Sequence, residues 1–292
     1  MRGLTRRQLL VSAGGLGVVG IGVAAGLVGP RALRGLAQDE CGEQGTRPPG
    51  SGLEVRYETI RTAFVRRPVE IAIALPPGAR RGDAVPVCVC LPGRGGRGRD
   101  VMGVLRMHDF MAQGVAERGA APFALVGVDG GESYWHRRAD GEDRMAMLER
   151  EVLPRLADRH GLGAGGAPRA LMGWSMGGYG ALRAAQRSPH AFRAVVAVSP
   201  ALWTRHDAAA EGAFDGPRDF ARNDVFAALD RLAEIEVRVD CGRADPFVEA
   251  ARTLIELLPR RPSGGISDGC HDAGYWFRVA PAQVDFLGRL LA

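Results

Sequence analysis

Residues 170–178 read ALMGWSMGG, a Gly-x-Ser-x-Gly motif whose central residue is Ser175. The run Ala170–Trp174 is short and apolar, as in a buried strand, and Gly177–Arg187 has the pattern of a helix. A serine between a strand and a helix sits on a sharp turn that lifts its hydroxyl above the end of the sheet. Gly173 and Gly177 leave room for such a turn because neither carries a side chain. The motif therefore predicts a nucleophilic serine at position 175.

Strand-like and helix-like segments alternate on both sides of this motif. The expected strands are Leu53–Ile60, Val69–Leu75, Val85–Leu91, Phe123–Val128, Ala170–Trp174, Ala194–Val198 and Glu236–Asp240. The expected helices are Val101–Arg118, Glu142–His160, Gly177–Arg187, Pro246–Leu258 and Pro281–Leu291. The first two strands alternate apolar and polar residues, which favours an antiparallel pair, whereas most later runs are continuously apolar. This order predicts an α/β domain over residues 53–292, with a mostly parallel central sheet covered by helices on both faces.

Residues 1–37 have the pattern of a signal for export. Arg6 and Arg7 precede an apolar, Gly-rich run from Leu9 to Val28, as in signals of the twin-arginine (Tat) type. Small residues allow cleavage after Ala37, although the run is long enough to remain as an uncleaved membrane anchor. Residues 38–52 are polar and rich in Gly and Pro, which predicts a flexible linker. We therefore expect a protein that is secreted or held at the cell envelope.

The net charge of +5 does not indicate a nucleic-acid partner. Five arginines lie in the first 37 residues, where no acidic residue occurs, and the 33 arginines that remain face 33 acidic residues. The chain after the export signal is thus formally neutral, and its sequence contains no basic stripe of the kind that binds phosphate backbones.

A longer stretch around the serine carries a resemblance to a known family. Residues 173–182 read GWSMGGYGAL, and further matches are VDGGESYW (128–135), EVLP (151–154), SPHAF (188–192) and VSP (198–200). This set resembles the esterase D family of α/β-hydrolases, which includes S-formylglutathione hydrolases, feruloyl esterases and bacterial mycolyltransferases. The resemblance implies an α/β-hydrolase fold, a serine carboxylic-ester hydrolase, and no metal or organic cofactor.

The partners of the serine are expected in the chain order serine, acid, histidine. His271, in GCHDAGYW (269–276), is the late histidine that resembles the base of the family. Asp245, in DCGRADPF (240–247), resembles the acid, although an aspartate there could instead cap the helix that follows. Asp240 is the next candidate, with Glu249 and Asp272 after it; Glu249 is included because mycolyltransferases use a glutamate beyond this loop.

Two backbone N–H groups are expected to bind the developing oxyanion. One belongs to Met176, at the start of the helix after the serine. The other, by resemblance, belongs to Arg94 in the Gly-rich loop PGRGG (92–96) after the third strand. The aromatic residues expected to line a substrate pocket are Tyr134, Trp135, Trp203 and Trp276, with core packing as the alternative role for each.

The five cysteines after the export signal are odd in number, so at least one is free or pairs between chains. Cys88 and Cys90 share one face of a strand and are expected to be small core residues. Cys241 and Cys270 lie close in sequence to the candidate acid and base, so a working triad could bring them together in a disulfide. Buried free thiols explain these two residues equally well.

Two other functions remain open at this stage. The chain could transfer an acyl group to a sugar or lipid hydroxyl, as mycolyltransferases do, or it could be a non-catalytic binding protein of the cell envelope on the same fold. The expected partner in either catalytic case is a small-molecule ester or a lipid or sugar ester.

Overall fold

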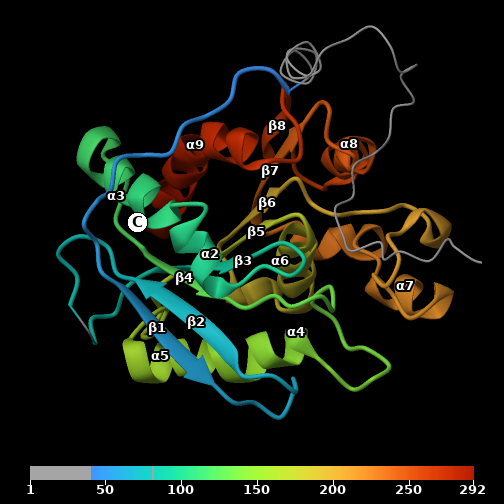
Figure 1. The fold of residues 1–292 in the computed structure, drawn as a ribbon, viewed down its shortest axis with the longest axis horizontal. Helices are drawn as coiled ribbons and strands as arrows, with labels where there is room; N and C mark the ends of the chain where they lie inside the picture. The colour runs from blue at the N-terminus through green and yellow to red at the C-terminus, as the bar shows by residue number, and fades with distance from the viewer. Residues whose placement is uncertain (1–40, 81) are drawn as a thin grey trace, which may run out of the picture. The chain divides into compact units, whose positions relative to one another are not determined.

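The computed structural model describes residues 41–80 and 82–292, which form one eight-stranded sheet (Figure 1). The strands follow the order β1-β2-β4-β3-β5-β6-β7-β8 across the sheet. Their bounds are β1 Val55–Ile60, β2 Val69–Ala74, β3 Val87–Leu91, β4 Ala124–Val128, β5 Arg169–Trp174, β6 Ala194–Val198, β7 Glu236–Gly242 and β8 Ser263–Ser267. β1 and β2 run antiparallel to their neighbours, and the other six strands are parallel. The predicted, mostly parallel α/β sheet is thereby confirmed.

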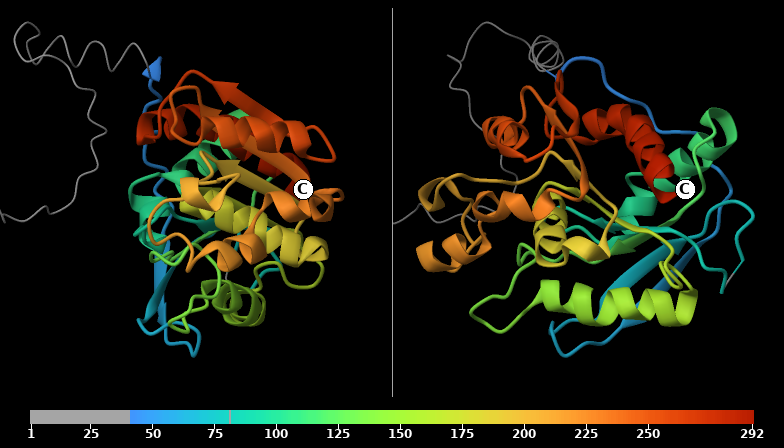
Figure 2. Two further views of the ribbon diagram at one scale, coloured as in Figure 1. Left: turned by 90° about the vertical axis from the view of Figure 1, so that its right-hand side faces the viewer. Right: turned by 180° about the vertical axis from the view of Figure 1, so that it is seen from behind.

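Helices cover both faces of the sheet because successive residues of its inner strands are apolar and point to opposite faces. Leu171 and Val195 belong to one hydrophobic core, and Met172 and Val196 belong to the other. Residues of α2 (Gly98–Gly103), α3 (Met107–Arg118) and α9 (Ala273–Leu291) pack in the second core. Residues of α4 (Arg144–Met147), α5 (Leu153–His160), α6 (Met176–Arg187) and α8 (Val248–Leu257) pack in the first, and a π-helical turn at Leu148–Val152 joins α4 to α5. Figure 2 shows α9 and α5 on opposite sides of the sheet.

The chain between β6 and β7 contributes mostly short helices. It contains a 3₁₀ turn at His206–Ala208, then α7 (Pro217–Asn223), and then a 3₁₀ stretch at Phe226–Leu232. A further 3₁₀ turn, Pro189–Ala191, connects α6 to β6. Figure 1 shows α7 on the same side of the molecule as the loop that precedes α4.

Three elements differ from the sequence-based prediction for identifiable reasons. β8 reads SGGIS and lacks an apolar run, and it forms as an edge strand by pairing with β7. α9 begins at Ala273 rather than at Pro281, because the Asp272 carboxylate accepts the Tyr275 N–H (2.8 Å) and caps a helix that has Pro281 inside it. The predicted helix Val101–Arg118 is two helices, because Arg106 adopts a left-handed conformation (φ 57°) between them.

Residues 41–52, whose composition predicted a linker, are attached to the domain at three points. Cys41 forms a disulfide with Cys270, and the Gly45 N–H donates to the Gly274 carbonyl (2.8 Å). The backbone N–H and the hydroxyl of Ser51 both donate to one carboxylate oxygen of Asp109 (2.7 and 2.6 Å). The segment therefore runs along α9 toward α3 (Figure 1), a course that composition alone cannot indicate.

The expected export signal lies outside the described residues. Among the helices that the structure does describe, none is both long and apolar enough to cross a membrane.

Candidate active site

Ser175 lies on a sharp turn between β5 and α6. It follows the last residue of β5 and precedes Met176, the first residue of α6, with φ 54° and ψ −119°. A positive φ at a non-glycine residue costs about 1–3 kcal/mol, so the surrounding structure must hold it. A Cβ atom at Gly173 would collide with the Gly177 carbonyl, and one at Gly177 would collide with the Leu91 carbonyl. Both glycines are thus required by the close approach of backbones around the serine.

Asp245 and His271 form a hydrogen-bonded pair on neighbouring loops. The Nδ1–H of His271 donates to Oδ2 of Asp245 (2.8 Å), and the Phe247 N–H donates to the other carboxylate oxygen (2.8 Å). Asp245 is buried, whereas His271 is half-buried. With its proton on Nδ1, the imidazole keeps an unprotonated Nε2 that can accept a proton.

Backbone hydrogen bonds hold the two loops together. The Arg243 N–H donates to the Ser267 carbonyl (2.7 Å), and the Ala244 N–H donates to the Gly269 carbonyl (2.9 Å). The loops follow β7 and β8, and Ser175 follows β5 in the same parallel part of the sheet. The three side chains therefore gather at one edge, where the carboxyl ends of parallel strands meet. Within residues 41–80 and 82–292, the Ser175 hydroxyl itself makes no hydrogen bond, as is common for catalytic groups before a substrate binds.

The other candidate acids are engaged elsewhere. Asp240 is buried inside β7, where Arg238 donates to both of its oxygens (2.8 Å each) and Gln283 donates to one (2.8 Å). Burial raises the pKa of this carboxyl above its ordinary value. Glu249 is exposed on α8 and lies 3.6 Å from Arg252, and Asp272 caps α9. Of the four acids, the structure pairs Asp245 with His271.

The two N–H groups expected to bind an oxyanion, those of Met176 and Arg94, belong to segments that adjoin Ser175. Met176 is the first residue of α6, so its N–H has no acceptor inside the helix. The loop with Arg94 passes close to the serine: a Cβ built on Gly93 would lie 3.5 Å from the Ser175 Cβ. The Arg94 guanidinium points to other partners, the Glu132 carboxylate (3.6 Å) and the Glu211 carbonyl (3.4 Å).

A series of aromatic contacts leads from the loop after β4 to the base. The ring centroids of Tyr134 and Trp203 are 5.7 Å apart, those of Trp203 and Phe247 5.5 Å, and those of Phe247 and His271 5.3 Å. Trp276 lies 5.4 Å from His271. We call Tyr134, Trp203, Phe247 and Trp276 the aromatic wall.

One of the four expected pocket aromatics lies apart from this wall. Trp135 is fully buried in the core with Leu182 and its neighbours, and it makes none of the aromatic contacts just described. Phe247, which the sequence analysis did not name, contacts His271. Its position two residues after Asp245 is the feature of the sequence from which its closeness to the site could have been predicted.

Ser199 is a second residue that the sequence analysis missed. It directly follows β6 in a left-handed conformation (φ 46°), and its hydroxyl accepts the indole N–H of Trp276 (3.1 Å). Ser199 thereby fixes the orientation of a ring that contacts His271. A serine before a proline gives no sign in the sequence that it will meet a tryptophan 77 residues later.

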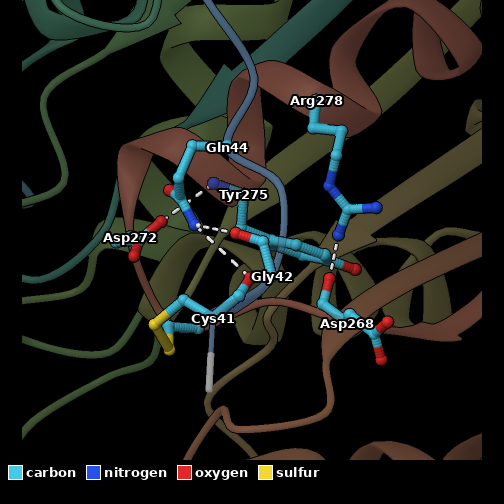
Figure 3. Close-up of a disulfide and its surroundings, with 8 residues drawn as sticks. Cys41, Gly42, Gln44, Asp268, Asp272, Tyr275 and Arg278 are labelled. Carbon is cyan, nitrogen blue, oxygen red and sulfur yellow. Dashed lines mark hydrogen bonds between the residues drawn. A yellow bond between two sulfur atoms is a disulfide. The ribbon is translucent and has the colours of Figure 1, made fainter. Parts of the chain in front are cut away.

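The hypothesis of a Cys241–Cys270 disulfide is wrong. Cys270 is bonded to Cys41, with Cα atoms 4.9 Å apart, and Cys241 is a buried free thiol (Figure 3). Cys241 lies within β7, and burial, reinforced by the nearby Asp245 carboxylate, raises the pKa of its thiol well above the ordinary value. Cys88 and Cys90 are buried free thiols, as expected of small core residues.

Figure 3 shows the disulfide and its surroundings, which include Gln44, Asp272 and Tyr275. Gln44 donates weakly to the carbonyl groups of Cys41 and Gly42 (3.4 and 3.5 Å). On the other side of the bond, His271 directly follows Cys270 in the chain. In the described part of the chain, one group of possible metal ligands lies close together, Cys41, Cys270 and Asp272, and two of its three members are in the disulfide.

A serine on a strained turn, a histidine bound to a buried carboxylate, and backbone N–H groups in the adjoining segments are the kinds of groups that acyl transfer requires. Residues 62–262 match the family model described as "Putative esterase". None of the curated proteins matches the chain.

Solved structures of known enzymes share the fold. A ferulic acid esterase is 21% identical and matches with a TM-score of 0.71 over 81% of this chain and 98% of its own. An S-formylglutathione hydrolase from Agrobacterium tumefaciens is 15% identical, with a TM-score of 0.69 over 86% of this chain and 100% of its own. A ferulic acid esterase from Anaeromyces mucronatus, in complex with ferulic acid, is 15% identical, with a TM-score of 0.65 over 84% of this chain and 94% of its own.

Proposed function

Since this chain belongs to the esterase family and is a carboxylic ester hydrolase, we propose that it acts through an acyl-enzyme on Ser175, with His271 as the base and Asp245 as the acid that orients it. The observation that carries this proposal is the 2.8 Å hydrogen bond from His271 Nδ1 to the buried Asp245 carboxylate. It fixes the tautomer that leaves Nε2 free to take a proton.

Acylation begins when His271 Nε2 takes the Ser175 hydroxyl proton and the serine oxygen attacks the ester carbonyl carbon. The carbonyl π electrons move to the oxygen, which becomes an oxyanion held by the Met176 and Arg94 N–H groups. The tetrahedral intermediate collapses, the bond to the alcohol oxygen breaks, and His271 returns its proton to that oxygen. The products of this half-reaction are the alcohol and an ester of Ser175.

Deacylation repeats the sequence with water. His271 takes a proton from the water molecule, the hydroxide attacks the acyl carbon, and the same two N–H groups hold the oxyanion. The carboxylic acid leaves as Ser175 regains its proton. Asp245 stays ionised throughout and stabilises the imidazolium that forms in each step.

The aromatic wall supports a small-molecule ester as the substrate. Trp203, Phe247 and Trp276 are all half-buried. Phe247 and Trp276 contact His271, so these rings present apolar area next to the base. One relative in the same fold holds ferulic acid, an aromatic acid. An ester of an aromatic or short acyl group is therefore the substrate class to test first.

The location of the enzyme is part of the proposal. The arginine pair and apolar run of residues 1–37 favour export to the cell envelope or the medium. A disulfide between Cys41 and Cys270 is in keeping with an oxidising compartment. Cleavage after Ala37 would leave Cys41 in the mature chain, so export and the disulfide are compatible.

The experiment is labelling of the purified protein with a fluorophosphonate probe, beside the variant Ser175→Ala. We expect labelling of the wild type alone, together with turnover of p-nitrophenyl acetate and methyl ferulate. Glycerol added as an acceptor measures the competing acyl transfer, since hydrolysis predicts free acid as the main product. A folded wild-type protein that neither labels nor turns over esters would refute the proposal.

A further inference from the structure

A cavity of about 1140 Å³ lies between the loop after β4, α6 and the segment with α7. Ser175, Asp245 and His271 do not line it, so it is separate from the candidate active site. Six arginines contribute to its lining, and they come from all three walls: Arg137, Arg138, Arg183, Arg187, Arg218 and Arg222.

The acidic residues in the lining do not balance these arginines. They are three aspartates, Asp143, Asp215 and Asp219. Asp215 is paired with Arg138 (2.8 Å), and Asp219 is 3.4 Å from Arg222. Asp143 caps α4 by accepting the Ala146 N–H (2.8 Å). Arg187 is paired with Glu149, which lies outside the lining (2.8 Å). Arg137, Arg183 and Arg218 form no ion pair within the described residues, so the cavity has an excess of positive charge.

Arg183 shows that one of these charges is poorly compensated. Its guanidinium is half-buried, and it donates to two neutral oxygens, Gln186 Oε1 (2.9 Å) and the Arg222 carbonyl (3.2 Å). Burial lowers the pKa of this guanidinium below its ordinary value. Arg183 forms no ion pair within the described residues, so an anionic ligand in the cavity would give this half-buried cation a charge partner.

The walls of the cavity are fixed by hydrogen bonds that do not use the free guanidinium groups. Asp215 accepts the Ala139 N–H (2.6 Å), and Asp219 accepts the Asp215 N–H (3.0 Å). The buried His136 lies between Asp219, 3.1 Å from its Nε2, and the Tyr134 carbonyl, 2.9 Å from its Nδ1. The loop after β4 and the segment with α7 are thus joined before any ligand binds.

A neutral donor at the same place also lacks a partner. The indole Nε1 of Trp135, which contributes to the lining, is buried and makes no hydrogen bond to the described residues. Buried donors are nearly always paired in folded proteins, so an acceptor bound against Trp135 would satisfy a donor that the described residues leave unpaired.

We propose that this cavity binds a small ligand with several anionic groups, phosphate or carboxylate, through Arg137, Arg183 and Arg218. The guanidinium fork binds both groups in a bidentate manner. The volume of about 1140 Å³ is larger than one phosphate requires and slightly above the range of about 300–1000 Å³ for sites of small organic molecules. Arg137 and Arg218 are exposed and form no ion pair in the part of the chain that the structure describes, so their donors are available.

The loop after β4 connects this cavity to the candidate active site. Tyr134, a member of the aromatic wall, directly precedes the cavity-lining Trp135, and both residues have φ 52°. A ligand bound in the cavity would therefore contact the loop that also carries a member of the aromatic wall.

The test is calorimetric titration of the whole chain with sodium tripolyphosphate and, separately, with trigalacturonic acid, at one ionic strength. We expect one equivalent of at least one of these probes to bind, and the stronger binder identifies phosphate or carboxylate as the preferred group. The double variant Arg137→Gln/Arg218→Gln should weaken that binding at least tenfold, since each removed guanidinium contributes charge-assisted hydrogen bonds.

A matched control removes the same charge at a distance. Arg61 and Arg289 are exposed, lie outside the cavity lining and form no ion pair within the described residues. The variant Arg61→Gln/Arg289→Gln should bind as the wild type does, and both double variants should keep their turnover of p-nitrophenyl acetate. Binding of neither probe, or an equal loss in the control, would overturn the proposal and leave the arginines as solvated surface groups.

Discussion

The ring of Phe247 lies edge-on against the imidazole of His271, with ring centroids 5.3 Å apart and planes inclined by 66°. The backbone of the same residue donates to the carboxylate that binds His271. Trp276 contacts the imidazole as well, with centroids 5.4 Å apart. The imidazole of His271 is therefore oriented by packing as well as by its hydrogen bond.

Phe247→Ala removes this packing and should lower kcat for p-nitrophenyl acetate about 10-fold to 100-fold, because small displacements of a catalytic group have effects of that size. The half-buried ring also supports Trp203, so the free energy of unfolding should fall by about 1–2 kcal/mol. Leu257→Ala, at an exposed position of α8, is the control for loss of apolar area. If Phe247→Ala leaves kcat unchanged, the hydrogen bond to Asp245 is sufficient to orient His271 without the packing of Phe247.

Asp245→Asn should lower kcat by about 10³–10⁴-fold with little change in KM, because an amide cannot hold the required tautomer or stabilise the imidazolium. Steady-state kinetics beside Glu249→Gln provide the comparison. Glu249 is the exposed alternative acid, and its variant should keep full activity. The reverse result, activity lost at Glu249 and kept at Asp245, would transfer the role to the glutamate.

Asp240→Asn should affect stability rather than catalysis. The buried carboxylate accepts hydrogen bonds from Arg238 and Gln283, and its neutral replacement leaves a largely buried guanidinium without its charge partner. We expect the free energy of unfolding in urea to fall by about 1.5–3 kcal/mol, which is the range for hydrogen bonds to charged groups. Activity per folded molecule, measured with the fluorophosphonate probe as the count of sites, should remain that of the wild type.

Cys41→Ser should lower the free energy of unfolding by about 4–5 kcal/mol, because the Cys41–Cys270 bond closes a loop with a sequence separation of 229 residues. Thermal unfolding with and without reductant checks this estimate. Reductant should lower the Tm of the wild type to that of the variant and leave the variant unchanged. If reductant has the same effect on both proteins, the stabilisation comes from another source.

Glu58 on β1 links stability to pH. Its hydrogen bond to Arg155 is the main cause that holds the pKa of this carboxyl below its ordinary value of 4.5, and His160 contributes from 3.0 Å. A lowered folded-state pKa stabilises the fold fully above pH 4.5 and ceases to do so as the pH falls through the lower folded value. Glu58→Gln should therefore cost about 0.5–1 kcal/mol near neutral pH. The difference from the wild type should shrink in urea unfolding as the pH is lowered below 4.5.

Sequence patterns identified the central strands because parallel strands are apolar throughout, as VCVCL, ALVGV and AVVAV illustrate. They did not identify β8, whose residues SGGIS form a strand only because β7 offers an edge. The patterns also did not predict the break between α2 and α3 at Arg106, because the left-handed conformation of an arginine does not alter the hydrophobic pattern.

The candidate site shows the same division between local and long-range information. Ser175 could be named from its local motif, and Asp245 and His271 from short segments that resemble a family. The Cys41–Cys270 pairing and the Trp276–Ser199 hydrogen bond join residues that only the folded sheet brings together. Neither contact could therefore be predicted from the sequence.

The position of the disulfide also determines how the molecule behaves when its backbone is cut. β1 begins at Val55 and β8 ends at Ser267, so every strand of the described sheet lies between the two bonded cysteines. A protease that cleaves an exposed connection between strands opens a covalent ring and releases no fragment. Each half keeps its neighbours in the sheet and stays attached to the other half through sulfur. Such a nicked molecule would migrate as one species on a gel without reductant, and the cut would become visible only after the sulfur bridge is reduced.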